Sequence, residues 1–220
     1  MATVAENNSA WLETSDKRPT ATRAASRKPG DERWKELLEV SARLFAEQGY
    51  AATSLQNIAD AVGMLKGSLY YYINSKDDLL FQVIKAVYVP GVARFKAVSG
   101  EGGDAVDRLR RALESHVLYL IENPTATTVY LHEFERLSAE RREELAGVDY
   151  AKMVRDLIRI GQDQGGFRRD LDPTIAAMSV LGSANWTYRW YRPGTQAPKE
   201  IARQLADISV RGLVADQPPA

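Results

Sequence analysis

Residues 53–72 of the chain read TSLQNIADAVGMLKGSLYYY, and this stretch decides the fold of the N-terminal part. Its first half places four apolar residues at helical spacing: Leu55, Ile58, Ala59 and Val62. Thr53 or Ser54 can cap the helix that they define. Gly63 ends it, because glycine adopts the left-handed conformation of a helix stop at little cost. A second short helix then begins at Lys66, so the stretch predicts a helix-turn-helix.

The second helix of this pair carries residues suited to reading DNA. Leu69 and Tyr70 are expected to anchor it inward. Its outward residues are small, charged or able to hydrogen-bond, as a helix in the major groove requires. Ser75 and Asp78 form a predicted capping box for the next helix, which leaves Lys76 free to reach a phosphate. The predicted DNA-binding residues are Thr53, Ser54, Lys66, Gly67, Ser68, Tyr70, Tyr71, Tyr72 and Lys76.

These residues resemble the TetR family of bacterial transcriptional repressors. The resemblance covers about residues 31–80 and rests on three motifs: Ala-Asp-x-x-Gly at 59–63, Gly-Ser-Leu-Tyr-Tyr at 67–71 and Ser-Lys-Asp-Asp-Leu at 75–79. The family usually has Ser where Leu65 stands, so the second helix lacks a side-chain N-cap. Tyr72 and Ile73 replace the commoner His-Phe. The resemblance implies binding to a double-stranded DNA operator and dimerisation through the last two helices.

Composition limits the classes of protein to which the chain can belong. Of its 220 residues, 45% are hydrophobic and 26% are charged, which is ordinary for a globular protein. The chain has no Cys and two His, which argues against disulfides and a zinc centre, so we predict no metal site and no cofactor. The sequence shows no long apolar run and no signal peptide. We therefore expect a cytoplasmic protein that does not bind membranes.

The charge distribution gives little nonspecific attraction to DNA. The formal net charge is +0, and residues 31–80 hold eight acidic and five basic side chains. Binding must therefore depend on a few well-placed cations and on helix N-termini. Residues 1–30 are predicted to be a disordered basic arm. Simple disorder, an arm that follows DNA phosphates or the minor groove, and a transit peptide all remain open for it.

From Asp31 onward the chain is predicted to be all-α, with about nine helices. An N-terminal three-helix headpiece with the helix-turn-helix, residues 31–76, precedes a C-terminal helical ligand-binding and dimerisation domain, residues 77–216. Residues 140–144 are interpreted as a solvated charged segment. Helix boundaries are expected at Asp31, Gly49, Pro90-Gly91 (a kink or an end), residues 99–103, Asn123-Pro124, Gly165-Gly166, Asp172-Pro173, Arg192-Pro193-Gly194 and Pro198.

The helix predicted from Pro173 to about Tyr191 is rich in small residues, which let helices approach closely. One headpiece covers a single half-site, whereas a dimer reads two, so we expect a homodimer. Packing within one chain is the simpler alternative for this helix. The predicted dimer contacts are Ala177, Leu181, Ala184, Tyr188, Ile201, Leu205 and Ile208.

The end of that helix is the candidate effector site, since Trp and Arg together can line an apolar cavity with an anion-binding end. Residues 185–194, together with 166–172, resemble a TetR subgroup that senses acyl-CoA thioesters of fatty acids or of sterol-ring fragments. Sterol-type members have an Arg where this chain has Gly182. Core packing is the alternative for the tryptophans. The predicted effector-binding residues are Tyr130, Phe134, Trp186, Arg189 and Trp190.

The function predicted from the sequence is a ligand-responsive repressor that leaves a palindromic operator when it binds a small hydrophobic effector. An acyl-CoA thioester is the candidate effector, and a TetR-type regulator with another hydrophobic ligand, or with none, is the alternative. A small-molecule enzyme is a remote alternative. The chain shows no nucleophile beside a base, no phosphate-cradling glycine loop and no metal set, so we predict no catalytic residue.

Overall fold

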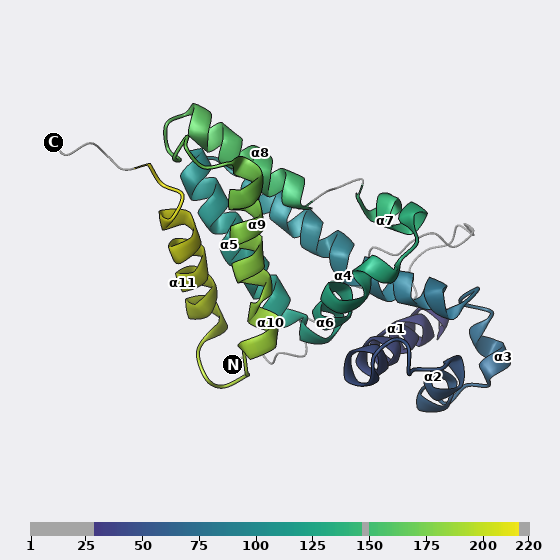
Figure 1. The fold of residues 1–220 in the computed structure, drawn as a ribbon. Coiled ribbons are helices and arrows are strands. Elements are labelled where there is room, and N and C mark those ends of the chain that lie inside the picture. Colours follow the sequence, from purple (N-terminus) through teal and green to yellow (C-terminus); the bar gives the residue numbers. More distant parts are fainter. Residues whose placement is uncertain (1–28, 147–149, 216–220) are drawn as a thin grey trace. The chain divides into compact units, whose positions relative to one another are not determined.

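A computed structural model describes residues 29–146 and 150–215, and the predicted N-terminal arm falls almost wholly outside them. The described residues form helices, and their β-structure is confined to one isolated bridge between Phe167 and Val214. The all-α class is therefore confirmed. In chain order (Figure 1) the helices are α1 (Pro29–Gln48), α2 (Leu55–Ala61), α3 (Lys66–Leu69), α4 (Lys76–Ser99), α5 (Ala105–Glu122), α6 (Pro124–Glu133), the 3₁₀ helix η2 (Phe134–Arg136), α7 (Ala139–Ala146), α8 (Tyr150–Asp163), α9 (Pro173–Asn185), α10 (Thr187–Trp190) and α11 (Pro198–Arg211).

The described helices exceed the predicted nine because of α7 and α10. The charged segment at residues 140–144, which was interpreted as solvated and assigned to no helix, forms part of α7. The helix expected to reach Tyr191 stops at Asn185, after which α10 begins. Helix α1 begins at Pro29 rather than after Asp31. A kink or a helix end was predicted at Pro90-Gly91. Pro90 lies inside α4, so the prediction of a helix end is wrong. A proline inside a helix costs about 3 kcal/mol, and Val87 and Val92 are buried on either side of this one.

The chain divides into two compact units, with the boundary in α4 at Pro90–Gly91. The first unit contains residues 29–90 and 123–145, and the second contains 91–122 and the described residues from 150 onward. The first unit therefore joins α1, α2, α3 and the start of α4 with α6, η2 and α7. Within the described residues, no helix is long and apolar enough to cross a membrane.

The core of the first unit brings together the three helices of the predicted headpiece. Leu37 and Phe45 of α1, Ile58 of α2 and Leu69 of α3 are all buried in it, along with the apolar side of α4. Gly49 ends α1 with φ +82° and Gly63 follows α2 with φ +65°, as predicted for glycine helix stops. The turn between α2 and α3 therefore has the backbone that a helix-turn-helix needs.

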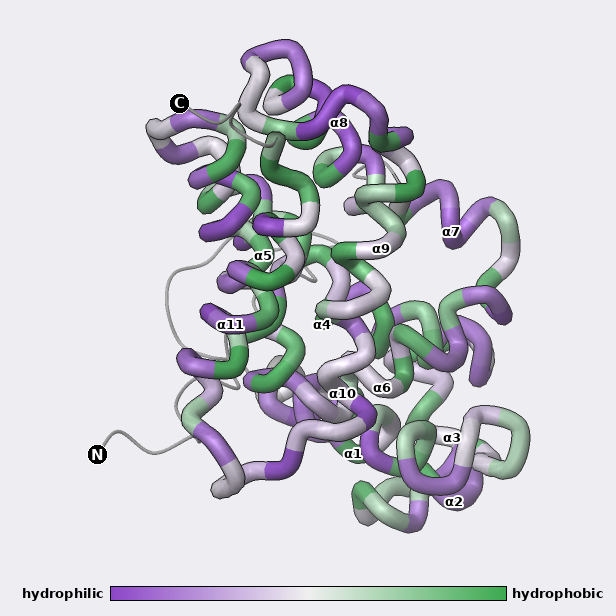
Figure 2. The backbone as a smooth tube through the Cα atoms, turned by 60° about the vertical axis from the view of Figure 1, so that its left-hand side comes forward, coloured by the Kyte–Doolittle hydropathy of each residue, from purple (hydrophilic) through white to green (hydrophobic). Residues whose placement is uncertain are grey.

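The second unit packs around α5, whose neighbours are α8, α9 and α11. Figure 2 shows hydrophobic and hydrophilic positions alternating along α11, whose apolar side turns toward α5. Asp172 caps α9 by accepting hydrogen bonds from the amides of Thr174 and Ile175, and Pro173 stands at the first helical position. This predicted helix start is confirmed.

Candidate functional site

Helix α2 begins with a complete capping box. The Ser54 hydroxyl accepts a hydrogen bond from the Asn57 amide at 3.1 Å, and the Asn57 side-chain oxygen accepts one from the Ser54 amide at 2.9 Å. Of the two caps considered, Ser54 is therefore the one used. Both side chains stay exposed at the N-terminus of α2, where amides and the helix dipole favour a phosphate.

The contact to DNA predicted for Thr53 is wrong in this structure. Its side chain is fully buried, and its hydroxyl donates to the carbonyl oxygens of Gly49, at 2.9 Å, and Leu44, at 3.3 Å. A buried hydroxyl needs such partners, because leaving it without them would cost a hydrogen bond. Thr53 thus joins the end of α1 to the start of α2.

Helix α3 presents the predicted recognition surface to solvent. Lys66, Gly67 and Ser68 are exposed, and Leu69 is fully buried as the anchor. Tyr71 is 88% exposed, so its ring and hydroxyl are free to meet a partner molecule. These residue types at the start of an exposed helix suit the major groove.

Two tyrosines of this region lie differently from the prediction. Tyr70 was expected to anchor α3 but is 53% exposed, because Leu69 alone occupies the inward position. Tyr72 was expected to face outward but is half-buried, and its ring stacks on Trp34 of α1 with ring centroids 6.2 Å apart. Tyr70 therefore remains available for DNA, whereas Tyr72 has mainly a packing role.

The N-terminus of α3 lacks a side-chain cap, as predicted from Leu65. Leu65 occupies the N-cap position with extended backbone angles (φ −69°, ψ 139°) and makes no capping hydrogen bond. Its side chain is 81% exposed. The position thus has the geometry of an N-cap without the oxygen that would accept a helix amide.

Replacing Leu65 with Ser is expected to raise the free energy of unfolding by about 1 kcal/mol, because the hydroxyl would accept an orphan amide of α3. Urea denaturation followed by circular dichroism measures the change. Leu65→Ala is the matched control, since it removes the same exposed side chain without adding an acceptor. Equal stability of the Ser and Ala variants would contradict the assignment of a missing cap.

Lys76 is not free in this structure, contrary to the prediction. Its ammonium donates to the carbonyl oxygens of Tyr50, at 2.8 Å, and Thr53, at 2.7 Å, and lies 4.2 Å from the centroid of the Tyr50 ring. The Ser75 hydroxyl accepts from the Asp78 amide at 3.0 Å, so the predicted N-cap of α4 is present. The Asp78 carboxylate accepts from the Asn74 amide instead of completing the box at Ser75. Lys76 therefore holds the loop before α2.

The predicted effector residues are divided between the two units. Tyr130 and Phe134 lie in the first unit and form a three-ring cluster with Tyr88 of α4, with centroid distances of 5.3 to 6.1 Å. Trp186, Arg189 and Trp190 lie in the second unit, at the break between α9 and α10, and are exposed. Core packing is thereby excluded as the main role of the two tryptophans.

Most of the predicted dimer contacts are buried inside their own unit. Ala177, Leu181, Ala184 and Ile201 are each at most 7% exposed, because these faces of α9 and α11 pack on the unit's own core. These four side chains therefore pack mainly within their own unit, and partner contacts at them stay a prediction. Tyr188 and Leu205 are half-buried, and Ile208 is 68% exposed.

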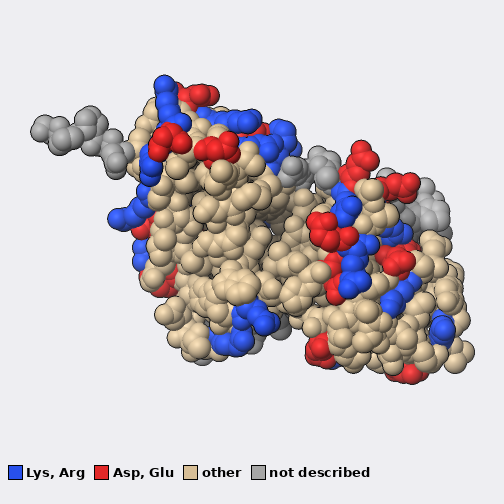
Figure 3. Space-filling view, in the orientation of Figure 1, with Lys and Arg blue, Asp and Glu red and all other residues tan. Residues whose placement is uncertain are grey.

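The opposite face of α9 is exposed and has no charge. Helix α9 contains no Asp, Glu, Lys or Arg, and in Figure 3 the surface over it is uncharged while charged side chains lie around it. Next to it, a groove of about 360 Å³ runs between α9 and α11, with Ile175 and Ile208 among its lining residues. We call this exposed surface the α9–α11 face; it is made of Ile175, Met178, Ser179, Gly182, Ser183, Trp186 and Ile208.

A buried polar cluster lies at the end of α9 and was not predicted from the sequence. The His116 ring of α5 lies between the Asn185 side-chain oxygen, 2.9 Å from Nε2, and the Tyr150 hydroxyl, 2.7 Å from Nδ1. A neutral imidazole with its proton on Nε2 donates to Asn185 and accepts from Tyr150. Burial lowers the pKa of His116 from 6.5 to about 4, against an opposing effect of the Asn185 hydrogen bond.

This shift predicts acid sensitivity of the fold. Between pH 6.5 and 4 the unfolded chain carries a proton on His116 that the folded chain lacks, so stability falls as the pH falls through this window. The loss attributable to His116 is about 3 kcal/mol by pH 4. Urea unfolding at several pH values should show a flatter pH profile for His116→Gln than for the wild type. A pH profile of His116→Gln as steep as that of the wild type would contradict the assignment.

Comparisons with known proteins agree with this geometry. The family model of bacterial regulatory proteins of the tetR family matches residues 37–83, which contain the helix-turn-helix. The model of tetracyclin repressor-like C-terminal domains matches residues 102–213. The chain belongs to the TetR family. As a TetR-family protein it is a regulator rather than an enzyme.

Named relatives of this TetR-family chain are also transcriptional regulators. The HTH-type transcriptional repressor KstR2 of Rhodococcus jostii (strain RHA1) is 29% identical over 185 residues, covering 82% of this chain and 90% of the relative. The structure of the ketosteroid transcriptional regulator KstR2 of Mycobacterium tuberculosis matches with a TM-score of 0.77 and 27% identity, over 88% of this chain and 100% of that one. The structure of AibR in complex with isovaleryl coenzyme A and operator DNA matches with a TM-score of 0.71 and 30% identity, over 83% and 98%.

Proposed function

We propose that the protein is a homodimeric, ligand-responsive repressor that acts in the bacterial cytoplasm and leaves a palindromic operator when a hydrophobic effector binds. The observation that carries the proposal is the exposed face of α3, anchored by buried Leu69. In this proposal residues 31–76 read DNA and residues 77–216 bind the effector and dimerise. Relatives named as HTH-type repressors support it.

The proposed DNA contacts differ in kind. Ser54, at the N-terminus of α2, and Lys66 and Tyr71, at α3, are placed for phosphates, whereas Gly67 and Ser68 allow the helix to approach base edges. Lys66 is exposed, while the ammonium of Lys76 already bonds two carbonyl oxygens. We therefore assign the main cationic contact of each headpiece to Lys66.

The proposed effector is an acyl-CoA thioester. Its support is the resemblance of residues 185–194 and the similarity to AibR, whose structure contains isovaleryl coenzyme A. Arg189, which is exposed on α10, is the proposed partner of an anionic group, since guanidinium binds carboxylate or phosphate in a bidentate manner. Trp190, in the same unit as Arg189, is the proposed contact for an apolar part of the effector, and the contacts of Tyr130 and Phe134 stay predictions from the sequence.

The DNA proposal is tested by selecting duplexes from a randomised library with the wild-type protein and measuring their affinity by fluorescence anisotropy. Lys66→Ala is expected to weaken binding and to flatten the plot of log K against log salt by about one contact per headpiece. Lys152→Ala is the control, because this exposed lysine lies on α8 and pairs with Asp156. Absence of any enriched duplex, or an unchanged salt slope for Lys66→Ala, would contradict the proposal.

The effector proposal is tested on the same protein–DNA complex. Isovaleryl-CoA and longer acyl-CoA thioesters are expected to release the duplex, whereas free coenzyme A and the free acids are the controls. A thioester at 100 times its dissociation constant should also stabilise the protein by about 2.7 kcal/mol in thermal unfolding. A complex that persists with every thioester tested would limit the function to DNA binding.

A further inference from the structure

The first turn of α4 holds both ends of the helix-turn-helix. At the leading end, the ammonium of Lys76 bonds the carbonyl oxygens of Tyr50 and Thr53, directly before the Ser54 cap of α2. At the trailing end, the Asp78 carboxylate accepts a hydrogen bond from the Asn74 amide at 3.0 Å. The orientation of α3 therefore depends on where this turn lies.

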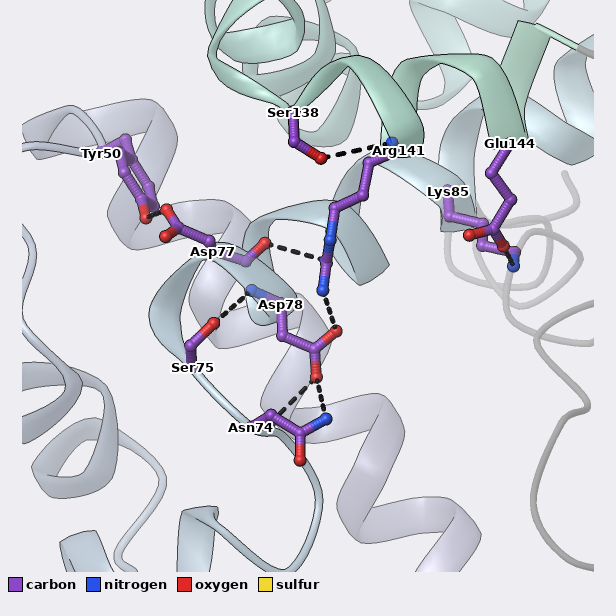
Figure 4. A network of polar contacts seen from close by, with 9 residues as sticks. All are labelled: Tyr50, Asn74, Ser75, Asp77, Asp78, Lys85, Ser138, Arg141 and Glu144. Carbon is purple, nitrogen blue, oxygen red and sulfur yellow. Dashed lines mark hydrogen bonds and ion pairs between the residues drawn. The ribbon is translucent and has the colours of Figure 1, made fainter.

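Arg141 of α7 reaches this turn from a distant part of the sequence (Figure 4). Its guanidinium donates to the Asp78 carboxylate at 3.0 Å and to the Asp77 carbonyl oxygen at 3.2 Å. The same guanidinium lies 4.7 Å from the centroid of the Phe81 ring. One side chain of α7 thus contacts three of the first six residues of α4, which all belong to the first compact unit.

Helix α7 is docked firmly enough to give this contact a defined geometry. Leu145 is buried in the core of the first unit, and Glu144 forms an ion pair with Lys85 of α4 at 2.7 Å. The carboxylate of Asp78 is 12% exposed and the side chain of Arg141 is 30% exposed. A hydrogen-bonded ion pair that is largely shielded from water contributes more than an exposed one.

The neighbouring Arg142 shows the contrast. It also lies on α7 and forms an ion pair, at 2.8 Å, but its partner Glu135 is 86% exposed and lies in η2 rather than in α4. Arg142 therefore has the charge of Arg141 without its connection to the helix-turn-helix. It offers a matched control for any substitution of Arg141.

We propose that Arg141 is a positioning residue for DNA recognition: through Asp78 and the first turn of α4, its guanidinium sets the orientation of α3. This inference rests on the proposed DNA-binding function. Reading base edges requires α3 to be held within a fraction of an ångström, whereas attraction to phosphates tolerates small rotations. Loss of Arg141 therefore reduces the preference for the recognised sequence and leaves nonspecific binding in place.

The test compares a duplex selected by the wild-type protein with a shuffled duplex of the same length. Arg141→Met, which keeps an apolar chain over Phe81, is expected to weaken binding to the selected duplex about tenfold, the scale of one lost charged hydrogen bond. Binding to the shuffled duplex should change less than twofold, and the salt slope should stay unchanged. Arg141→Lys should restore part of the affinity, and Arg142→Met should behave as wild type.

A second set of variants tests the route through Asp78. Asp78→Asn should reproduce the loss, and the double variant Arg141→Met/Asp78→Asn should lose little more than either single variant, because both break one contact. Thermal unfolding of each variant shows how much of it is folded at the assay temperature. Unchanged affinity of Arg141→Met for the selected duplex, or an equal loss on both duplexes, would overturn the inference. If the wild-type protein enriches no duplex, the proposed DNA-binding function is wrong, and this inference, which rests on it, is wrong as well.

Discussion

Replacing Ile208 with Asp is expected to turn the protein into a monomer and to abolish tight binding to a two-site operator. Ile208 is 68% exposed and lines the groove between α9 and α11, within the uncharged α9–α11 face. At a two-fold interface each substitution occurs twice and meets the partner's copy of the same face. Burying two carboxylates costs several kcal/mol, which raises the dimer dissociation constant at least about 100-fold.

The loss of DNA affinity follows from the loss of the dimer. A monomer engages one half-site and loses the linked second contact, so its affinity for the full site falls steeply. Sedimentation velocity measures the oligomeric state, and anisotropy with the selected duplex measures binding. Ile160→Asp is the control, since Ile160 is an exposed isoleucine of α8 outside the α9–α11 face. A dimer that survives Ile208→Asp would place the interface elsewhere.

Gly161→Ala is expected to destabilise the fold by about 3 kcal/mol and to lower Tm by roughly 10 °C. A Cβ atom at this position of α8 would lie 2.1 Å from Cδ2 of Phe167, which is far inside van der Waals contact. Phe167 is 1% exposed, and its amide donates to the Gly161 carbonyl oxygen at 3.1 Å. The ring therefore has no open space into which it can move.

The destabilisation should depend on the ring of Phe167. A smaller side chain in Gly161→Ala/Phe167→Leu should recover part of the lost stability relative to the sum of the two single variants. Gly67→Ala is the control, because a Cβ atom at this helical position meets nothing within 4 Å. Urea denaturation measures the free energy of unfolding of the four variants and of the wild type. Wild-type stability of Gly161→Ala would show that α8 and the Phe167 loop are packed more loosely than described.

Helix boundaries set by a local signal were predictable. The left-handed conformations of Gly49 and Gly63, the Asp172 cap and the missing cap at Leu65 each depend on a few adjacent residues, and each is found. Helix boundaries that depend on tertiary packing could not be predicted from the sequence. Pro90 should weaken a helix, yet α4 continues through it with Val87 and Val92 buried on either side.

The buried face of a helix was harder to predict where the helix has no charged residues to mark its exposed face. All positions of α9 are apolar, small or neutral, so helical periodicity cannot tell Ala177, which is buried, from Met178, which is exposed. Thr53 and Ser54 likewise have similar chemistry, and of their two hydroxyls it is that of Thr53, which is buried, that donates to the carbonyl groups of Leu44 and Gly49. The role of Arg141 was hidden in the same way, because its partner Asp78 lies 63 residues away.

The sequence by itself determined the helix-turn-helix, the helical class and most helix ends, because capping and turn formation are satisfied by hydrogen bonds within a few residues. Only the tertiary structure decided which faces are buried, which cations are already bonded, and how α7 contacts the start of α4. These outcomes depend on contacts between residues that are distant in the sequence. The residue type at one position does not indicate which of the competing contacts has the lowest free energy.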